Sequence, residues 1–238
     1  HWYATISSAF ETPTTTEFAN PTGGGFNQAL EPQESTNYEV GIKTLTDGYR
    51  FELALFHIDV ENELTPFEVS GRTFFENAGS STRDGVELSY FRQLTGQLGF
   101  SMAYTYSDFD FDKFTNADGD IFDGNQMPGI PQDLLHLGFS WFGDSGLYAS
   151  WDTTYTGDLF ADNGNLTSVE SSSVSNIRLG HNGFYGDWEV SSFLGVNNAF
   201  DEDYNNNVRI NAFGDRFFEP APEQNIYIGI TIRKRFTR

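Results

Sequence analysis

The segment Ile226-Tyr227-Ile228-Gly229-Ile230-Thr231-Ile232 carries an isoleucine at every second position. In an extended strand, this period of two puts the isoleucines on one face and Tyr227, Gly229 and Thr231 on the other. The same alternation recurs along most of the chain. It predicts strands whose apolar side faces a lipid band and whose polar side lines a wet interior.

The composition fits membrane-crossing strands better than membrane-crossing helices. The 238 residues have a mean hydropathy of -0.44, and no run approaches the roughly 18 consecutive apolar residues that a spanning helix needs. Transmembrane barrels dilute their lipid-facing residues with lumen-facing ones and carry aromatic girdles at both interfaces. Since the aromatic fraction is 16%, we predict an all-β, antiparallel, up-and-down transmembrane β-barrel.

The net charge of -21 argues against binding to nucleic acid, which calls for clustered Lys and Arg. The chain has no cysteine, which excludes disulfide and thiolate chemistry. Most acidic residues fall in predicted loops. We interpret them as a solvated outer surface, with the attraction of cationic or metal-bearing solutes as the alternative.

Ten segments are each about as long as a strand that crosses a membrane at a tilt, roughly 9 to 11 residues plus an overhang. One face of each predicted strand is apolar and the other is more polar; in the segment 34–45, for example, Tyr38, Val40 and Ile42 alternate with Glu39 and Lys43. The predicted strands cover residues 2–10, 34–45, 49–60, 82–92, 97–107, 133–142, 147–156, 172–181, 187–198 and 224–236.

The connections between these strands alternate in length. The Gly, Asp and Asn of tight hairpins fill the short ones, at 46–48, 94–96, 143–146 and 182–186. Long polar connections lie between them, at 11–33, 61–81, 108–132, 157–171 and 199–223. Short periplasmic turns and long extracellular loops are typical of outer-membrane barrels, so the alternation predicts the orientation. Since the first residues already alternate without a preceding secretion signal, we expect a fragment.

Five stretches carry a family resemblance. They are residues 30–43, the 72–88 segment with its Asn-Ala-Gly turn, and residues 127–131, 196–204 and 217–222. In this order they resemble the C-terminal half of the barrel of TonB-dependent outer-membrane receptors of the siderophore and ferric-citrate type. The chain departs from the family at Ala199, at Glu223-Gln224 in place of Gly-Arg, and at Thr237-Arg238, which follow the closing aromatic Phe236.

The resemblance implies that residues 1–238 form the C-terminal portion of a barrel of 22 strands in the outer membrane of a Gram-negative bacterium. The N-terminal plug, the TonB box and the first dozen strands then lie outside this chain. It also implies no enzyme activity and no required cofactor. The expected partners are the TonB-ExbB-ExbD complex, outer-membrane lipid including lipopolysaccharide, and a small-molecule chelate, most simply an iron chelate.

Ferric siderophores and ferric citrate are often anionic, so the resemblance directs attention to Arg and aromatic residues in the outer loops. We expect ligand binding by Arg72, Arg83, Tyr204, Arg209, Asn211, Phe213 and Arg216. The rival interpretation of each arginine is an ion pair within the loops, because Glu76, Asp215 and Glu219 are close in sequence.

A second candidate site is the loop at residues 116–125. Its carboxylates Asp118, Asp120 and Asp123 offer hard oxygen ligands for Ca²⁺, although the EF-hand spacing and its bidentate Glu are absent. A solvated Asp/Gly-rich loop is the rival interpretation.

Two other classes of protein remain as alternatives. His57 and Asp59 share a strand face, which evokes the pairs of ten-stranded outer-membrane proteases, but Leu53 and Leu55 on that face point the pair towards lipid headgroups. A self-contained ten-stranded barrel, an enzyme of that kind or a small pore, is therefore the first alternative. A soluble β-sandwich or adhesin module is the second.

Overall fold

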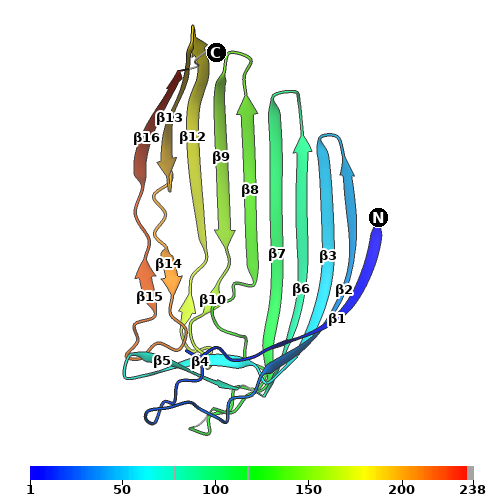
Figure 1. Cartoon of the computed structure of the whole chain (residues 1–238), viewed down its shortest axis with the longest axis vertical. Coiled ribbons are helices and arrows are strands. Elements are labelled where there is room, and N and C mark those ends of the chain that lie inside the picture. The colour runs from blue at the N-terminus through cyan, green and yellow to red at the C-terminus, as the bar shows by residue number, and fades with distance from the viewer. Residues whose placement is uncertain (78, 117, 235–238) are drawn as a thin grey trace.

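The computed structural model describes residues 1–77, 79–116 and 118–234 (Figure 1). Its main element is one sheet of ten strands in which each strand pairs antiparallel with its neighbours. Among the described residues, no helix is long and apolar enough to cross a membrane. The strands, in spatial order, are β1 (Trp2–Glu11), β2 (Gln33–Thr46), β3 (Tyr49–Glu61), β6 (Ser80–Gln93), β7 (Leu98–Lys113), β8 (Asp133–Phe142), β9 (Leu147–Thr156), β12 (Ser172–Tyr185), β13 (Trp188–Asn197) and β16 (Asn225–Lys234).

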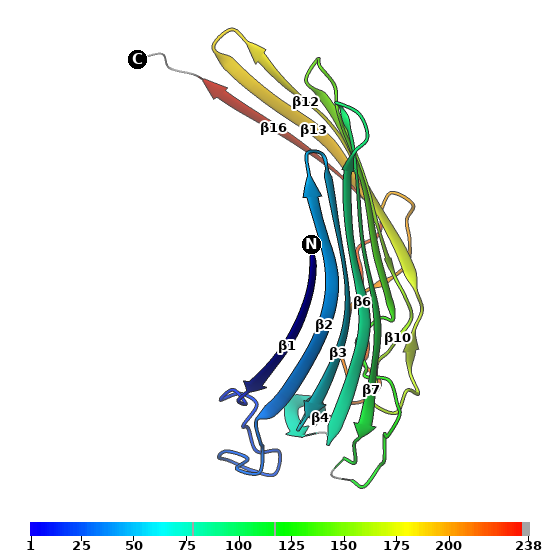
Figure 2. The same cartoon turned by 90° about the vertical axis from the view of Figure 1, so that its right-hand side faces the viewer.

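The sheet is open and strongly curved, like part of the wall of a cylinder (Figure 2). Over the described residues, β1 and β16 form its two edges and do not pair with each other. This order contradicts the alternative of a closed ten-stranded barrel and agrees with part of a larger one. The β-sandwich is also contradicted, because Ile226, Ile228, Ile230 and Ile232 are 60–74% exposed instead of packing against a second sheet.

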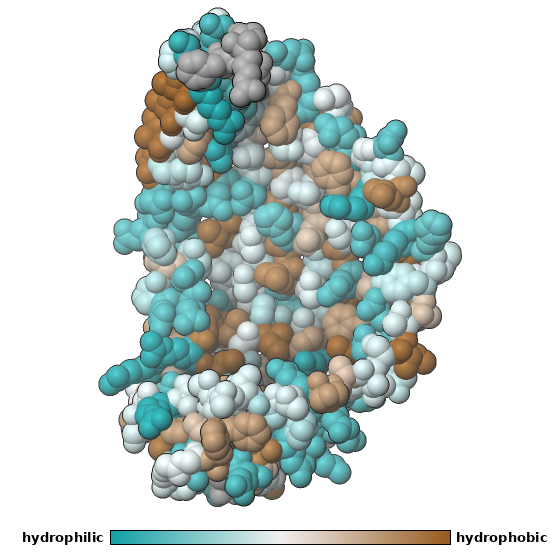
Figure 3. Space-filling view, viewed as in Figure 1, coloured by the Kyte–Doolittle hydropathy of each residue, from teal (hydrophilic) through white to brown (hydrophobic). Residues whose placement is uncertain are grey.

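The register of the strands aligns their apolar side chains into rows across the sheet. Val40, Leu55, Val86 and Tyr106 are direct neighbours on β2, β3, β6 and β7. The alternate positions form the concave face, which Figure 3 shows as a mixture of hydrophilic, pale and scattered apolar groups. The predicted division into an apolar outer face and a more polar inner face is therefore confirmed.

Five glycines on the concave face lie directly opposite aromatic residues of the neighbouring strand. A Cβ atom added to Gly195 would lie 2.2 Å from Cζ of Tyr227, and one added to Gly85 would lie 2.2 Å from Cζ of Phe56. The rings thus occupy the space that a glycine leaves, a known way to support glycine in a sheet. Three further cross-strand pairs share this arrangement: Tyr3 with Gly41, Tyr148 with Gly180, and Phe193 with Gly229.

Three small hairpins fold within connections for which the sequence predicted only loops. They are β4 (Leu64–Val69) with β5 (Arg72–Asn77), β10 (Leu159–Phe160) with β11 (Ser168–Val169), and β14 (Asn205–Val208) with β15 (Phe218–Pro220).

The β7 strand is longer than the sequence predicted. It continues to Lys113, so Asp108, Asp110 and Asp112 lie on a strand and not in the following loop. The alternation with Phe109 and the buried Phe111 extends the strand, because the phenylalanines pack on one side while the carboxylates stay on the other.

Some predicted features lie outside the described residues. They are Ala78 of the Asn-Ala-Gly turn, Ala117 of the candidate calcium loop, and the closing aromatic Phe236 with Thr237 and Arg238.

Candidate functional site

Five long connections lie at the end of the sheet that the sequence predicts to be extracellular, and hydrogen bonds join them to one another. The most prominent is the β4–β5 hairpin, which lies crosswise below the ends of the strands, on their concave side (Figures 1 and 2). Its base is fixed to the sheet, and its far part contacts the connection between β13 and β16.

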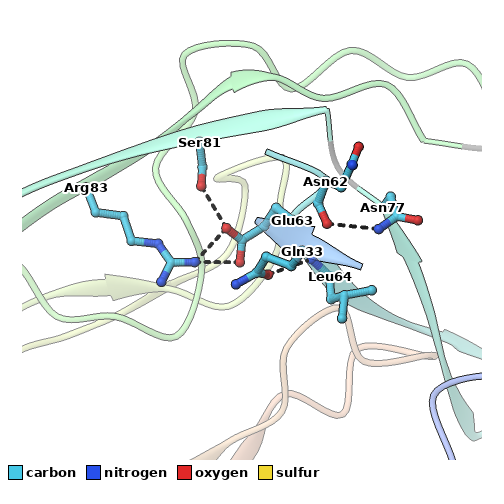
Figure 4. A network of polar contacts seen from close by, with 7 residues as sticks. All are labelled: Gln33, Asn62, Glu63, Leu64, Asn77, Ser81 and Arg83. Atoms are coloured by element: carbon cyan, nitrogen blue, oxygen red, sulfur yellow. Dashed lines mark hydrogen bonds and ion pairs between the residues drawn. The ribbon is translucent and has the colours of Figure 1, made fainter. Parts of the chain in front are cut away.

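A buried ion pair holds the base of this hairpin. Glu63 accepts hydrogen bonds from Nη2 of Arg83 at 2.6 and 2.5 Å and from the hydroxyl of Ser81 at 2.7 Å. Figure 4 shows Arg83 and Ser81 converging on the Glu63 carboxylate. The Glu63 side chain is only 7% exposed, and a buried carboxylate requires such a partner. Arg83 therefore fixes the loop to β6.

Amides complete the base of the hairpin. Asn77 accepts a hydrogen bond from the Glu31 N–H at 2.9 Å and donates to the carbonyls of Glu31 and Asn62 at 3.0 and 2.8 Å. Gln33 accepts from the Leu64 N–H at 3.0 Å. These bonds connect the start of β2 to the start of β4 and the end of β5.

Asn211 holds the other part of the hairpin. Its Nδ2 donates to the carbonyl of Pro66 at 2.8 Å, and its Oδ1 accepts from the N–H of Asn163 at 2.9 Å. Nearby, the N–H of Phe213 donates to the Glu68 carboxylate at 3.1 Å. One asparagine thus joins three connections that are far apart in sequence.

Asparagines also join the β7–β8 and β9–β12 connections. Asn165 exchanges two hydrogen bonds of 2.8 Å with the backbone of Gln126, and Asn125 donates to the carbonyl of Asn163 at 2.8 Å. Two small apolar clusters lie beside this network. One joins Phe111, Phe114, Phe122 and Met127, and the other joins Ala161, Val169, Val208, Ala212 and Phe217.

Two adjoining cavities lie beside these connections. The first has a volume of about 490 Å³, within the range of small-molecule sites. It is lined by inner-face residues of β9 and β12, including Thr154, Thr156 and Asn176, and by loop residues that include Tyr204, Asn205, Asn206 and Asn207. The second, of about 650 Å³, shares four lining residues with the first: Val169, Glu170, Tyr204 and Asn205.

The residues that the sequence predicts to bind a ligand lie apart from one another in the structure. Of the seven, only Tyr204 lines these two cavities. Arg209 binds Glu219 through Nε at 2.8 Å and Nη2 at 2.7 Å, as the rival interpretation expected. Arg209 thereby lowers the pKa of the Glu219 carboxyl, with a smaller contribution from Asn207.

The remaining predicted residues occupy different settings. The Arg72 guanidinium lies 5.4 Å from the ring centre of Phe74. Phe213 and Arg216 are exposed, and Arg216 makes no hydrogen bond or ion pair with any described residue. Together with Arg83 in its pair with Glu63, the arginines do not converge on one point.

The described residues give no support for the predicted calcium site. In the described part of the chain, no three His, Cys, Asp or Glu side chains could together hold a metal ion. The loop uses its carboxylates internally: Asp123 accepts from the Phe114 N–H at 2.8 Å, and Asp120 accepts from Nδ2 of Asn116 at 3.1 Å. Asp118 is exposed.

His57 lies between two carboxylates, at 2.8 Å from Asp84 and 3.2 Å from Asp59. It shares its strand face with Leu53 and Leu55, because these positions are two and four residues apart. The pair therefore points to the convex side, as predicted, and not to a catalytic cleft.

A profile of the family described as "TonB dependent receptor-like, beta-barrel" matches residues 1–199. The chain belongs to this family of TonB-dependent receptors. Membership places it in the outer membrane of Gram-negative bacteria, among receptors and not among enzymes, as the sequence predicted.

The fold of this receptor chain matches a known receptor. The crystal structure of the siderophore receptor PiuA from Acinetobacter baumannii aligns with 98% of the chain at a TM-score of 0.76 and 22% identity. The aligned part is 34% of the PiuA chain.

Sequence relatives cover the receptor chain in part. Probable TonB-dependent siderophore receptor PiuA of Acinetobacter baumannii is 29% identical over 120 residues, which are 47% of this chain and 16% of the relative. Metal-pseudopaline receptor CntO of Pseudomonas aeruginosa is 34% identical over 131 residues, 51% and 18% of the two chains. The ferrioxamine receptor of Yersinia enterocolitica is 29% identical over 186 residues, which are 74% of this chain and 24% of the relative. The chain thus spans 16–24% of these relatives.

Proposed function

We propose that the chain forms the C-terminal part of the barrel of a receptor that imports an iron chelate by TonB-dependent transport. The observation that carries this proposal is the structured extracellular end on a curved wall. Connections joined by side-chain hydrogen bonds border a cavity of small-molecule size beside inner-face residues of β9 and β12, while the convex face is apolar.

The names of the relatives support a metal chelate as the class of ligand. They are named as receptors for a siderophore, for ferrioxamine and for metal-pseudopaline. We infer iron as the metal because two of these three names, siderophore and ferrioxamine, denote iron carriers.

In the complete receptor, we infer that these ten strands are the last part of a barrel of 22 strands that surrounds an N-terminal plug. The polar concave face supports this arrangement, since a barrel interior that holds a plug or water is polar. The convex face contacts the lipid and lipopolysaccharide of the outer membrane.

The wall itself performs no bond chemistry in this proposal. Its paired strands satisfy the backbone hydrogen bonds in the membrane and hold the loop cavities in place. The ligand binds at the extracellular end, and the TonB-ExbB-ExbD complex then acts on the plug through the TonB box to open a path.

Uptake of radioactive iron tests the function. Cells that express the full-length receptor should accumulate labelled iron from at least one chelate, and cells without the receptor or without TonB should not. Equal uptake in cells with and without TonB would contradict the mechanism. Uptake of a chelated metal other than iron, without uptake of iron, would contradict the choice of metal.

A further inference from the structure

We propose that the two adjoining cavities receive a positively charged group, so that the receptor binds a cationic, amine-bearing metal chelate in preference to an anionic one. This inference rests on the proposed uptake function and specifies its ligand. It differs from the expectation drawn from the sequence, in which arginines bind an anionic chelate.

The charge of the lining residues is the first observation. Four carboxylates line the two cavities: Glu170 lines both, and Asp201, Glu202 and Asp203 line the second. Among the described residues, neither lining includes Lys, Arg or His. An anionic ligand in this place would face carboxylates with no positive charge to compensate them.

Of these four carboxylates, Glu170 and Asp203 are available to a ligand. The other two accept hydrogen bonds within the protein: Asp201 from the Gln224 N–H at 2.8 Å and Glu202 from the Ser173 N–H at 3.2 Å. Glu170 and Asp203 are exposed and make no hydrogen bond or ion pair with the part of the chain that the structure describes. These two are the counter-charges for an ammonium group.

The other lining groups suit a cation that carries a polar body. Tyr204 lines both cavities, and the face of its ring can attract a positive charge. Asn205, Asn206 and Asn207 add neutral amides, while Val208 and Ile210 add apolar surface. Such a mixture of apolar walls and few polar groups is typical of small-molecule sites.

Among the described residues, the arginines that are close in sequence to the lining residues do not themselves line a cavity. Arg209 is paired with Glu219. Arg178, two residues from Asn176 on β12, has its guanidinium 3.7 Å from the ring centre of Phe193. The whole chain has 34 Asp and Glu residues but only 13 Lys and Arg residues, so its net charge is negative. A field of this sign raises the local concentration of cations and lowers that of anions.

The walls of the cavities are held in place before a ligand arrives. Val169 and Val208, which line the first cavity, pack on the cluster of Ala161, Ala212 and Phe217. The carbonyl of Tyr204 accepts a hydrogen bond from the Ala221 N–H at 2.9 Å. A site that is ordered in advance loses less entropy on binding.

A charge series of one ligand tests the proposal on the full-length receptor. The probes are ferric complexes of a linear trihydroxamate that ends in a free amine, in its neutral N-acetyl form or in its anionic N-succinyl form. We expect affinity to fall in that order, by about three- to tenfold between the cationic and anionic forms, and the difference to shrink at high salt.

Two variants connect the preference to the cavities. Glu170→Gln and Asp203→Asn should each weaken the cationic complex by about two- to fivefold and leave the neutral complex unchanged. Asp215→Asn is the matched control, because it removes one exposed charge outside both cavities at a positive φ that Asn tolerates.

The outcomes separate this proposal from the proposed function. Equal affinity for the three forms, or preference for the anionic one, overturns the charge preference and leaves uptake intact. If the hydroxamates do not bind but anionic ferric catecholate or citrate is imported, the charge preference is again overturned. If no chelate is bound or imported, the proposed function itself fails.

Discussion

The ring of Tyr227 lies directly over Gly195 of the neighbouring strand, on the concave face of the sheet. Any side chain at Gly195 would displace this ring, because an added Cβ would come within 2.2–2.5 Å of Cζ, Cε1 and the hydroxyl oxygen. The glycine and the ring therefore depend on each other. The next residue pair along these two strands, Val196 and Ile226, points to the opposite face of the sheet.

We predict that Gly195→Ala destabilises the barrel of the full-length receptor by about 1–3 kcal/mol, the usual cost of overpacking a close contact. The measurement is the urea midpoint of unfolding in detergent or lipid. Gly96→Ala is the control, since an added Cβ there meets nothing within 4 Å. If Tyr227→Ala did not reduce the cost of Gly195→Ala, the contact would not be its cause.

Removal of Asn211 should loosen the β4–β5 hairpin. Asn211→Ala leaves the carbonyl of Pro66 and the N–H of Asn163 without their side-chain partner, at a cost of about 1–3 kcal/mol for partly buried groups. Hydrogen exchange should become faster at Glu68, Asn163 and Phe213 in particular. Asn206→Ala, at an exposed position whose side chain makes no hydrogen bond with the described residues, should leave these rates unchanged.

Glu63 should be essential for the base of the same hairpin. Glu63→Gln leaves the Arg83 charge without its carboxylate; breaking a fully buried pair costs about 3–5 kcal/mol, and the 23% exposure of Arg83 reduces this cost. Limited proteolysis within the hairpin, at Arg72, should then accelerate. Glu63→Met with Arg83→Met removes both charges and should restore much of the protection. If Glu63→Gln alone were as resistant to proteolysis as the natural chain, the ion pair would be dispensable for the hairpin.

The pairing of Arg209 with Glu219 predicts a dependence on pH. Because Arg209 lowers the pKa of Glu219 in the folded protein, the contribution of the pair is present above the ordinary pKa of a glutamate. It is lost as the pH falls through the lowered value. Carbon-13 NMR of labelled glutamate in the receptor measures this titration. Arg209→Gln should move the midpoint of Glu219 upwards, and an unchanged midpoint would refute the assignment.

The alternation of residues predicted the ten strands of the sheet, because burial in lipid and in the lumen imposes a period of two on each strand. It did not predict the β4–β5 hairpin, whose support comes from Arg83 and Asn211, distant in sequence from Glu63 and Pro66. The charge of the arginines predicts ligand binding, but folding of the loops gives Arg83 and Arg209 carboxylate partners. The cavity residue Glu170 carried no local signal in the sequence, since only the meeting of the 157–171 and 199–223 connections defines its surroundings.

The convex face provides the most direct test of orientation in the membrane. Ile228→Arg places a charge in the lipid band and should cost about 2–4 kcal/mol if this position lies near the bilayer midplane. Thr231→Arg lies on the opposite face of the same strand, so its guanidinium reaches the lumen and should cost less. The yield of assembled, heat-modifiable receptor in outer membranes compares the two variants. Because they share one strand and one introduced side chain, equal losses would mean that the apolar face of β16 does not contact lipid.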